Sequence, residues 1–224
     1  MIETARIYLI TPPVTDADAT LQLLEQACAS GEVSAVLVPL ALPDERAQVN
    51  ALKVLAPVVQ RSGAALLATG QVQAGAVQVA VRGGADGLHL SLLDTPPEAA
   101  AETVDDAAAS LKPERIVGVA CALTRHDAMT AGEMDIDYLM FGEPAADGSL
   151  PDPDLVVEMT GWWAEIFAVP CVGYAQSMDM VRDLAATGAE FVAVGPLVWE
   201  HPAGPAAAIE AIRKTIDTAG TSEQ

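Results

Sequence analysis

Short apolar runs rich in β-branched residues alternate along the chain with longer stretches in which apolar residues recur at helical spacing. This alternation predicts a series of βα units. The expected strands cover residues 6–10, 34–40, 64–68, 86–90, 115–120, 137–142, 169–173 and 191–195. The expected helices lie near residues 15–30, 44–61, 73–83, 97–111, 125–133, 153–166, 177–187 and 203–217.

The strands are almost continuously apolar, which indicates a parallel sheet covered on both faces. Eight strands alternating with eight helices predict an α/β fold, a single closed (β/α)8 barrel of the TIM type; a doubly wound open sheet is the alternative. No linker or shift in composition divides the chain. We therefore expect one domain over residues 1–217 and a frayed tail at 218–224.

Polar residues that precede the expected helices predict where those helices begin. Thr15, Thr124 and Ser177 each stand at such a position, and Ser177 is followed by the acidic Asp179. Hydroxyl side chains accept hydrogen bonds from the free N–H groups of a first helical turn, so these three residues are predicted N-caps.

The stretch "GGADGLHLSLLD" at residues 83–94 ends an apolar strand near a histidine and places an aspartate five residues later. Active sites of (β/α)8 barrels lie at the carboxyl ends of the strands. His89 and Asp94 are therefore candidate catalytic residues. Other interpretations stay open: His89 as a buried imidazole hydrogen-bonded to backbone, and Asp94 as the cap of the next helix.

Several further residues fall at the carboxyl ends of other expected strands and are candidates for substrate binding. These residues are Thr69, Cys121, Glu143, Tyr174, Gly173 and Gly195. Barrels often hold phosphate on backbone N–H groups after strands 7 and 8, which favours the two glycines; tight packing is the alternative for both. For Cys121 the alternatives are a nucleophilic thiol and a buried inert one.

The charge of the chain excludes some partners. Eleven Lys and Arg stand against 31 Asp and Glu, a formal net charge of −20. Such a protein repels nucleic acid and anionic membranes, so neither is an expected partner. Three widely spaced cysteines with no CxxC pair, and no signal-like or membrane-length apolar segment, lead us to expect a reducing, cytoplasmic location.

Trp162 and Trp163 are adjacent in an expected helix, where successive side chains point about 100° apart. One of them is therefore expected in the core and the other on the surface. A surface tryptophan makes a homodimer contact one interpretation.

Five segments together resemble one known family. "GGADGLHLSLLD" is similar to the "GADGVHLGQED" segment of the thiamine phosphate synthase family, which includes the related thiazole tautomerases. "RIYLIT" is similar to the first strand of the family. "IVGVACALTRHDA" resembles its "IIGVSAHS", "DIDYLMFGEP" its "GADYVGFGP", and "TGAEFVAVGPL" its "GADGVAVVSAI".

The resemblance implies a (β/α)8 barrel and a reaction. In that reaction a thiazole phosphate displaces diphosphate from an aminopyrimidine methyl diphosphate, with Mg²⁺ assisting, to form thiamine phosphate. It implies small phosphorylated heterocycles as ligands, Mg²⁺ as cofactor, and Asp94 as the matching metal ligand. A departing diphosphate requires Mg²⁺ and basic residues to carry its charge.

This chain departs from the family where those charges are handled. The family's Gln-x-Arg-x-Lys run after strand 2 is replaced by "VPLALPDER", where Arg46 is the nearest cation. "ATGQVQAGA" after strand 3 has no carboxylate, and "GEPAADGSLPDPD" after strand 6 has no lysine. Ala120 and Ala122 replace a serine and a histidine. We therefore expect the family reaction with impaired or altered catalysis; the alternative is a non-catalytic barrel that binds a small ligand or a partner.

Overall fold

Eight parallel strands close into a barrel in the computed structural model, which describes residues 4–70, 75–93 and 95–221. Each strand pairs with the next in sequence, and β8 pairs with β1. The predicted closed (β/α)8 barrel is confirmed and the open-sheet alternative is wrong. The strands are β1 (Arg6–Ile10), β2 (Val33–Val38), β3 (Ala65–Gly70), β4 (Gly87–Ser91), β5 (Ile116–Ala120), β6 (Tyr138–Phe141), β7 (Cys171–Tyr174) and β8 (Phe191–Val194).

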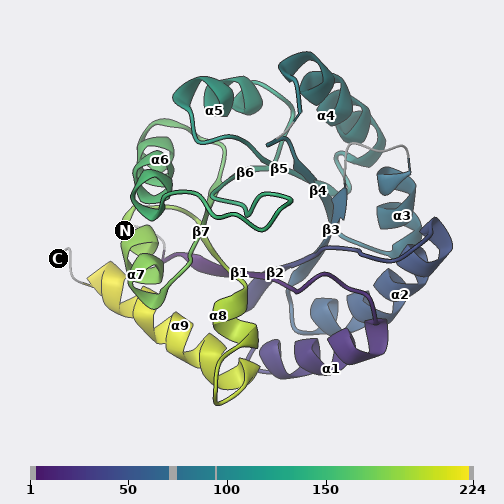
Figure 1. The fold of residues 1–224 in the computed structure, drawn as a ribbon, viewed down its shortest axis with the longest axis horizontal. Helices are drawn as coiled ribbons and strands as arrows, with labels where there is room; N and C mark the ends of the chain where they lie inside the picture. The colour runs from purple at the N-terminus through teal and green to yellow at the C-terminus, as the bar shows by residue number, and fades with distance from the viewer. Residues whose placement is uncertain (1–3, 71–74, 94, 222–224) are drawn as a thin grey trace.

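Helices form a ring around the strands, as Figure 1 shows in the view down the barrel. They are α1 (Ala17–Ala27), α2 (Glu45–Arg61), α3 (Ala76–Gly83), α4 (Pro97–Leu111), α5 (Arg125–Gly132), α6 (Pro153–Ile166), α7 (Met178–Ala186), α8 (Pro196–Trp199) and α9 (Pro205–Thr221). Within the described residues no helix is both long and apolar enough to cross a membrane.

The helix ends differ from prediction in three places. Thr124 and Ser177 cap α5 and α7 as predicted, but Asp16, rather than Thr15, caps α1, because its carboxylate accepts from two N–H groups of the first turn. The short helix α8 was not expected. Helix α9 continues past residue 217 to Thr221, and Ala219 within it is 6% exposed.

The strand periodicity divides the buried side chains into two layers. Because successive strand residues point to opposite faces, one set fills the barrel and the other packs beneath the helices. The inner set is small and contains every tyrosine of the chain: Tyr8, Ala35, Leu37, Leu67, Ala120, Tyr138, Met140, Val172, Tyr174 and Ala193. The outer set is larger and aliphatic, with Trp163 fully buried in it.

Carboxylates close the amino-terminal end of the barrel in a repeating way. Asp86, Asp137 and Glu190 each precede an even-numbered strand and accept a hydrogen bond from the first part of the odd-numbered strand beside it. The acceptor-to-nitrogen distances are 2.7 Å to Leu66, 2.7 Å to Val117 and 2.8 Å to Cys171. These bonds satisfy backbone N–H groups at the amino-terminal end of the sheet. In (β/α)8 barrels this end contributes to stability, and the active site lies at the opposite end.

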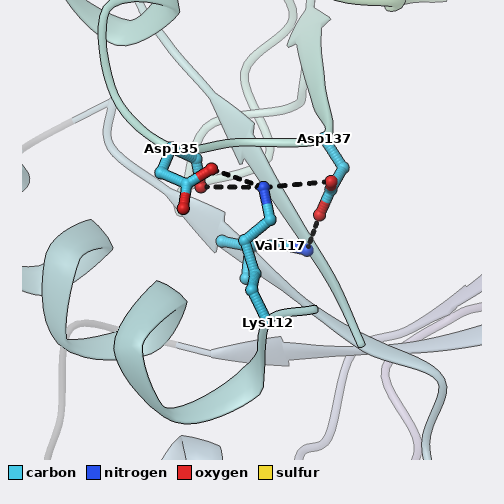
Figure 2. Close-up of polar contacts among 4 residues, drawn as sticks. All are labelled: Lys112, Val117, Asp135 and Asp137. Atoms are coloured by element: carbon cyan, nitrogen blue, oxygen red, sulfur yellow. Dashed lines mark hydrogen bonds and ion pairs between the residues drawn. The ribbon is translucent and has the colours of Figure 1, made fainter. Parts of the chain in front are cut away.

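Asp137 has a second partner, shown in Figure 2. Lys112 Nζ lies 3.1 Å from Asp137 Oδ1 and 2.6 Å from Asp135 Oδ1, while Asp137 Oδ2 accepts the Val117 N–H. The Asp135 side chain is 68% exposed and the Asp137 side chain 37%. Only Asp137 thus joins the ion pair to the sheet.

We predict that Asp137→Ala lowers the free energy of unfolding by about 1–3 kcal/mol, because the buried N–H of Val117 loses its acceptor. Asp135→Ala is the matched control, since an exposed ion pair contributes at most about 1 kcal/mol. Urea denaturation of both variants measures the difference. Equal losses in the two variants would contradict this account of the amino-terminal end.

Candidate functional site

A continuous chain of hydrogen-bonded side chains runs lengthwise through the barrel. We call it the polar chain; its members are Tyr8 of β1, Tyr138 of β6, His89 of β4, and Glu143, which follows β6. The hydroxyl oxygens of Tyr8 and Tyr138 are 2.7 Å apart, and the Tyr138 hydroxyl is 2.7 Å from His89 Nδ1. His89 Nε2 is 3.2 Å from Glu143 Oε1.

The residues of the polar chain are held by strand register and by one missing side chain. Gly118 of β5 is paired with His89 on one side and with Tyr138 on the other. A Cβ atom at Gly118 would lie 1.9 Å from Tyr138 Cζ and 2.4 Å from its hydroxyl oxygen. Tyr138 can therefore lie across β5 and reach the imidazole only because residue 118 is glycine.

Hydrogen-bond chemistry sets the direction of the polar chain. Ionised Glu143 only accepts, so His89 Nε2 must donate to it; when the imidazole is uncharged, its Nδ1 atom then accepts. Tyr138 donates to Nδ1 and accepts from Tyr8 in turn. Every donor points toward Glu143, and each of these donors has an acceptor.

Glu143 is the charged end of the polar chain. Burial opposes ionisation of its carboxyl group, but the nearby His89 and the Ser91 hydroxyl outweigh burial, so the pKa of Glu143 lies below its ordinary value. The side chain is 13% exposed. Its Oε2 atom is buried and makes no hydrogen bond of normal geometry. The nearby Ser91 hydroxyl does not make such a bond to Oε2 either.

The segment between β6 and α6 lies over this end of the barrel. It begins at Glu143 and crosses the middle of the ring in the view of Figure 1. Gln176 Nε2, after β7, donates to Pro151 O at 2.8 Å and ties the far end of the segment to the rim. Because His89 is fully buried, the histidine–carboxylate pair is covered in this structure.

The structure brings most of the predicted rim residues toward the same end. Thr69 is paired directly with His89 in the neighbouring strand, and Tyr174 is a buried member of the inner layer. A Cβ atom at Gly195 would be 3.5 Å from the Tyr174 hydroxyl oxygen, so these two residues are neighbours. Asp94 lies outside the described residues.

Two predicted residues face away from the barrel interior. Cys121 lines a separate pocket of about 140 Å³ together with Leu92 and Met134, and burial, with Asp127 nearby, raises the pKa of its thiol to about 12. That environment favours the inert-thiol interpretation. A Cβ atom at Gly173 would meet Leu184 of α7 at 2.5 Å, which favours tight packing at this position.

A cleft of about 460 Å³ opens at the carboxyl ends of β1, β2 and β3. Its described lining contains Thr69, Leu40 and three prolines, with Gln48 and the carboxylates of Asp44 and Glu45 as polar groups, and no lysine or arginine. Anion sites are built from cations and clustered N–H groups. This lining is unsuited to a polyanion.

The cations near this cleft do not compensate: Arg82 is paired with Glu45 itself, with 2.5 Å between Nη1 and Oε1. Arg46 is exposed in the first turn of α2. Arg125, at the start of α5, lies 3.6 Å from a Glu158 carboxylate oxygen and over the ring of Trp162, with 5.1 Å between its guanidinium carbon and the ring centroid. Arg125 is therefore engaged along α6.

The residues described here do not supply a magnesium site. No group of three or more His, Cys, Asp or Glu side chains among them could hold a metal ion. Glu143 is already paired with His89, and Mg²⁺ usually takes one or two carboxylates together with substrate phosphates. The expected ion rests on Asp94 alone and stays a prediction.

Sequence reasoning missed Tyr8, Tyr138 and Gly118. A usable signal was present: of the three tyrosines, Tyr8 and Tyr138 fall within expected strands and Tyr174 directly follows one, and all three point inward. Buried tyrosine hydroxyls usually find a hydrogen-bond partner, so that pattern predicts polar contacts inside the barrel.

The architecture defines a (β/α)8-barrel protein with a polar site at the carboxyl ends of its strands. Comparison with known proteins narrows the class. The family model described as thiamine monophosphate synthase matches residues 7–197. The thiamine-phosphate synthase of Rhodospirillum centenum is 37% identical over 206 residues, covering 91% of this chain and 94% of that protein. This chain belongs to the thiamine monophosphate synthase family.

A second relative agrees with that assignment, and two solved structures share the fold. The thiamine-phosphate synthase of Hyphomonas neptunium is 31% identical over 223 residues, covering 95% of this chain and 94% of the relative. A solved structure of thiamine phosphate pyrophosphorylase from Pyrococcus furiosus superposes with a TM-score of 0.70 at 22% identity, covering 96% of each chain. A 3-hexulose-6-phosphate synthase shares the fold with a TM-score of 0.67 at 18% identity, covering 93% of this chain and 99% of that one.

We predict that Gly118→Ala destabilises the protein by about 1–3 kcal/mol, because the added methyl group forces Tyr138 out of its place. Gly161→Ala on α6 is the matched control: its Cβ would be 3.5 Å from Thr187 Cγ2, an ordinary contact, and alanine favours a helix. Urea denaturation compares the two. A Gly118→Ala variant as stable as Gly161→Ala would show that Tyr138 does not depend on the glycine.

Proposed function

We propose that this chain is a thiamine phosphate synthase-type enzyme with altered catalysis. Its mouth binds an amino heterocycle that carries at most one phosphate. It turns over the aminopyrimidine methyl diphosphate of the family reaction far more slowly than a member that keeps the cationic residues. The observation that carries this proposal is the lining of the 460 Å³ cleft, where carboxylates and prolines stand and no cation does among the described residues.

Charge decides between the ligands. A diphosphate ester brings roughly two to three negative charges, and each like charge nearby costs on the order of 1 kcal/mol even when water screens it. Asp44 and Glu45 line the cleft, and Glu143 is held ionised at the end of the polar chain. The repulsion rises with every phosphate that a ligand carries; Arg82 pairs with Glu45, and the described lining itself holds no cation.

The other polar groups suit a heterocycle. Thr69 presents a hydroxyl and Gln48 an amide in the cleft lining, and Glu143 has carboxylate oxygens at the end of the polar chain. Acceptor oxygens bind ring and amino N–H groups, while proline and leucine side chains pack against a ring face. His89 and Tyr174 stay proposed substrate-facing residues at this end, and Gly195 stays a proposed site of phosphate contact.

Calorimetric titration with Mg²⁺ present tests the proposal. We expect the aminopyrimidine methyl diphosphate to bind no tighter than about millimolar, or about −4 kcal/mol, and the corresponding monophosphate at least about tenfold tighter. We expect Ala41→Arg, which adds a cation to the cleft, to tighten diphosphate binding about tenfold, since a charged hydrogen bond contributes about 1.5–3 kcal/mol. Val54→Arg, on the exposed face of α2, makes the same charge change and should leave binding unaltered.

Three outcomes are informative. Micromolar binding of the diphosphate by the unmodified protein would contradict the proposal and restore an ordinary synthase. Turnover of any thiazole phosphate and aminopyrimidine pair that disappears in Asp94→Ala or without Mg²⁺ would support the metal role of Asp94. Tight ligand binding with no product from any such pair would replace the enzyme with the non-catalytic barrel.

A further inference from the structure

A cavity at the amino-terminal end of the barrel meets the far end of the polar chain. It has a volume of about 220 Å³, and its lining includes Arg6, Tyr8, Ser34, Ala65, Tyr138 and Phe191. Arg6 is exposed, and Ser34 and Phe191 are only half-buried, so the cavity opens toward solvent at this end. Its volume is ample for several water molecules.

The two ends of the polar chain therefore differ in access to water. The tyrosine end lies against the open cavity. The other end is covered: His89 is fully buried, and Glu143 Oε2 is buried as well. Two tyrosines and a histidine joined at 2.7 Å each are unusual in a barrel interior, which aliphatic residues normally fill.

We propose that the polar chain is a proton relay, through which the Glu143 carboxylate exchanges protons with water in the amino-terminal cavity. A proton from cavity water bonds to the Tyr8 oxygen, and the Tyr8 proton moves to Tyr138. The Tyr138 proton moves to His89 Nδ1, and the Nε2 proton moves to Glu143 Oε1. Each intermediate group loses one proton and gains one, so the net change is one proton moved from water to the carboxylate.

In both end states every donor of the relay has an acceptor. Before transfer, all donors point toward Glu143. After transfer, Glu143 donates to Nε2, Nδ1 donates to Tyr138, Tyr138 donates to Tyr8, and Tyr8 donates to cavity water. The reverse sequence returns the proton.

The surroundings keep the relay neutral along its length. Burial raises the pKa of both tyrosine hydroxyls, and the nearby charges of Glu143 and, for Tyr138, Asp137 raise it further, so neither tyrosine ionises. Arg6 at the cavity and Ser91 beside Glu143 are the other polar groups at the two ends. The relay serves the mouth even while the β6–α6 segment covers it.

Nuclear magnetic resonance of protein labelled with ¹⁵N in histidine tests the relay. The chain has three histidines, and exposed His126 serves as an internal reference. We expect Tyr8→Phe, which cuts the link to the cavity but keeps the contacts of His89, to slow the interconversion of the Nε2–H and Nδ1–H forms of His89, measured by ¹⁵N relaxation dispersion, by at least about tenfold. Ile116→Val is the matched control, because Ile116 lines the same cavity and takes no part in the polar chain.

A second variant keeps the test decisive if Tyr8→Phe does not fold. Ala65→Leu fills the cavity from its half-buried wall without altering the polar chain, and we expect the same slowing. If the two protonated forms of the His89 ring interconvert at an unchanged rate in a folded Tyr8→Phe or Ala65→Leu variant, the relay is overturned. Protons would then reach His89 through the mouth. Equal slowing in Ile116→Val would overturn it too. No ligand is used, so the result is independent of the proposed function.

Discussion

The hydrogen bond between His89 Nδ1 and the Tyr138 hydroxyl joins the two halves of the barrel interior. On its carboxyl-terminal side it orients the imidazole so that Nε2 contacts Glu143. This contact helps to keep the buried carboxylate ionised. On the other side it ties the site to Tyr8 and the amino-terminal cavity. The bond in turn requires Gly118, because any side chain there would occupy the space of the tyrosine ring. We expect a substitution at any of these positions to alter the hydrogen bonds of the whole polar chain.

The site combines family architecture with an altered charge pattern. The barrel and its order of strands are those of the thiamine monophosphate synthase family. The described lining of the cleft at β1, β2 and β3 carries carboxylates, prolines and small residues and no lysine or arginine. A net charge of −20 adds to the repulsion that an anionic ligand meets on approach. Glu143, placed between Gly142 and Pro144, adds a buried negative charge at the centre of the mouth.

Much of the fold could be predicted from the sequence, because periodicity reports which faces are buried. The alternation of strands and helices led directly to the closed barrel, and Thr124 and Ser177 were recognisable caps. The prediction that Thr15 caps the first helix was wrong. Asp16, the next residue, is the cap, because its carboxylate reaches two N–H groups. Helix α8 was missed because a segment of its length, starting at Pro196, has too few residues to show a helical period.

The site was only partly predictable, for a different reason. His89 and Glu143 could be placed at one end of the barrel from their positions after strands. Their contact, and the contacts of Tyr8 and Tyr138, depend on the register of strands far apart in sequence, which local patterns do not contain. Cys121 and Gly173 show the same limit: both end strands, yet the structure packs them away from the barrel interior.

The tautomer of His89 tests the central claim most directly, because the direction of every hydrogen bond in the polar chain follows from it. In ¹⁵N spectra near neutral pH we expect the His89 ring proton on Nε2, with Nδ1 as an unprotonated acceptor, and we expect Tyr138→Phe to shift the Nδ1 signal. A proton resting on Nδ1, with Nε2 bare toward Glu143, would contradict the account.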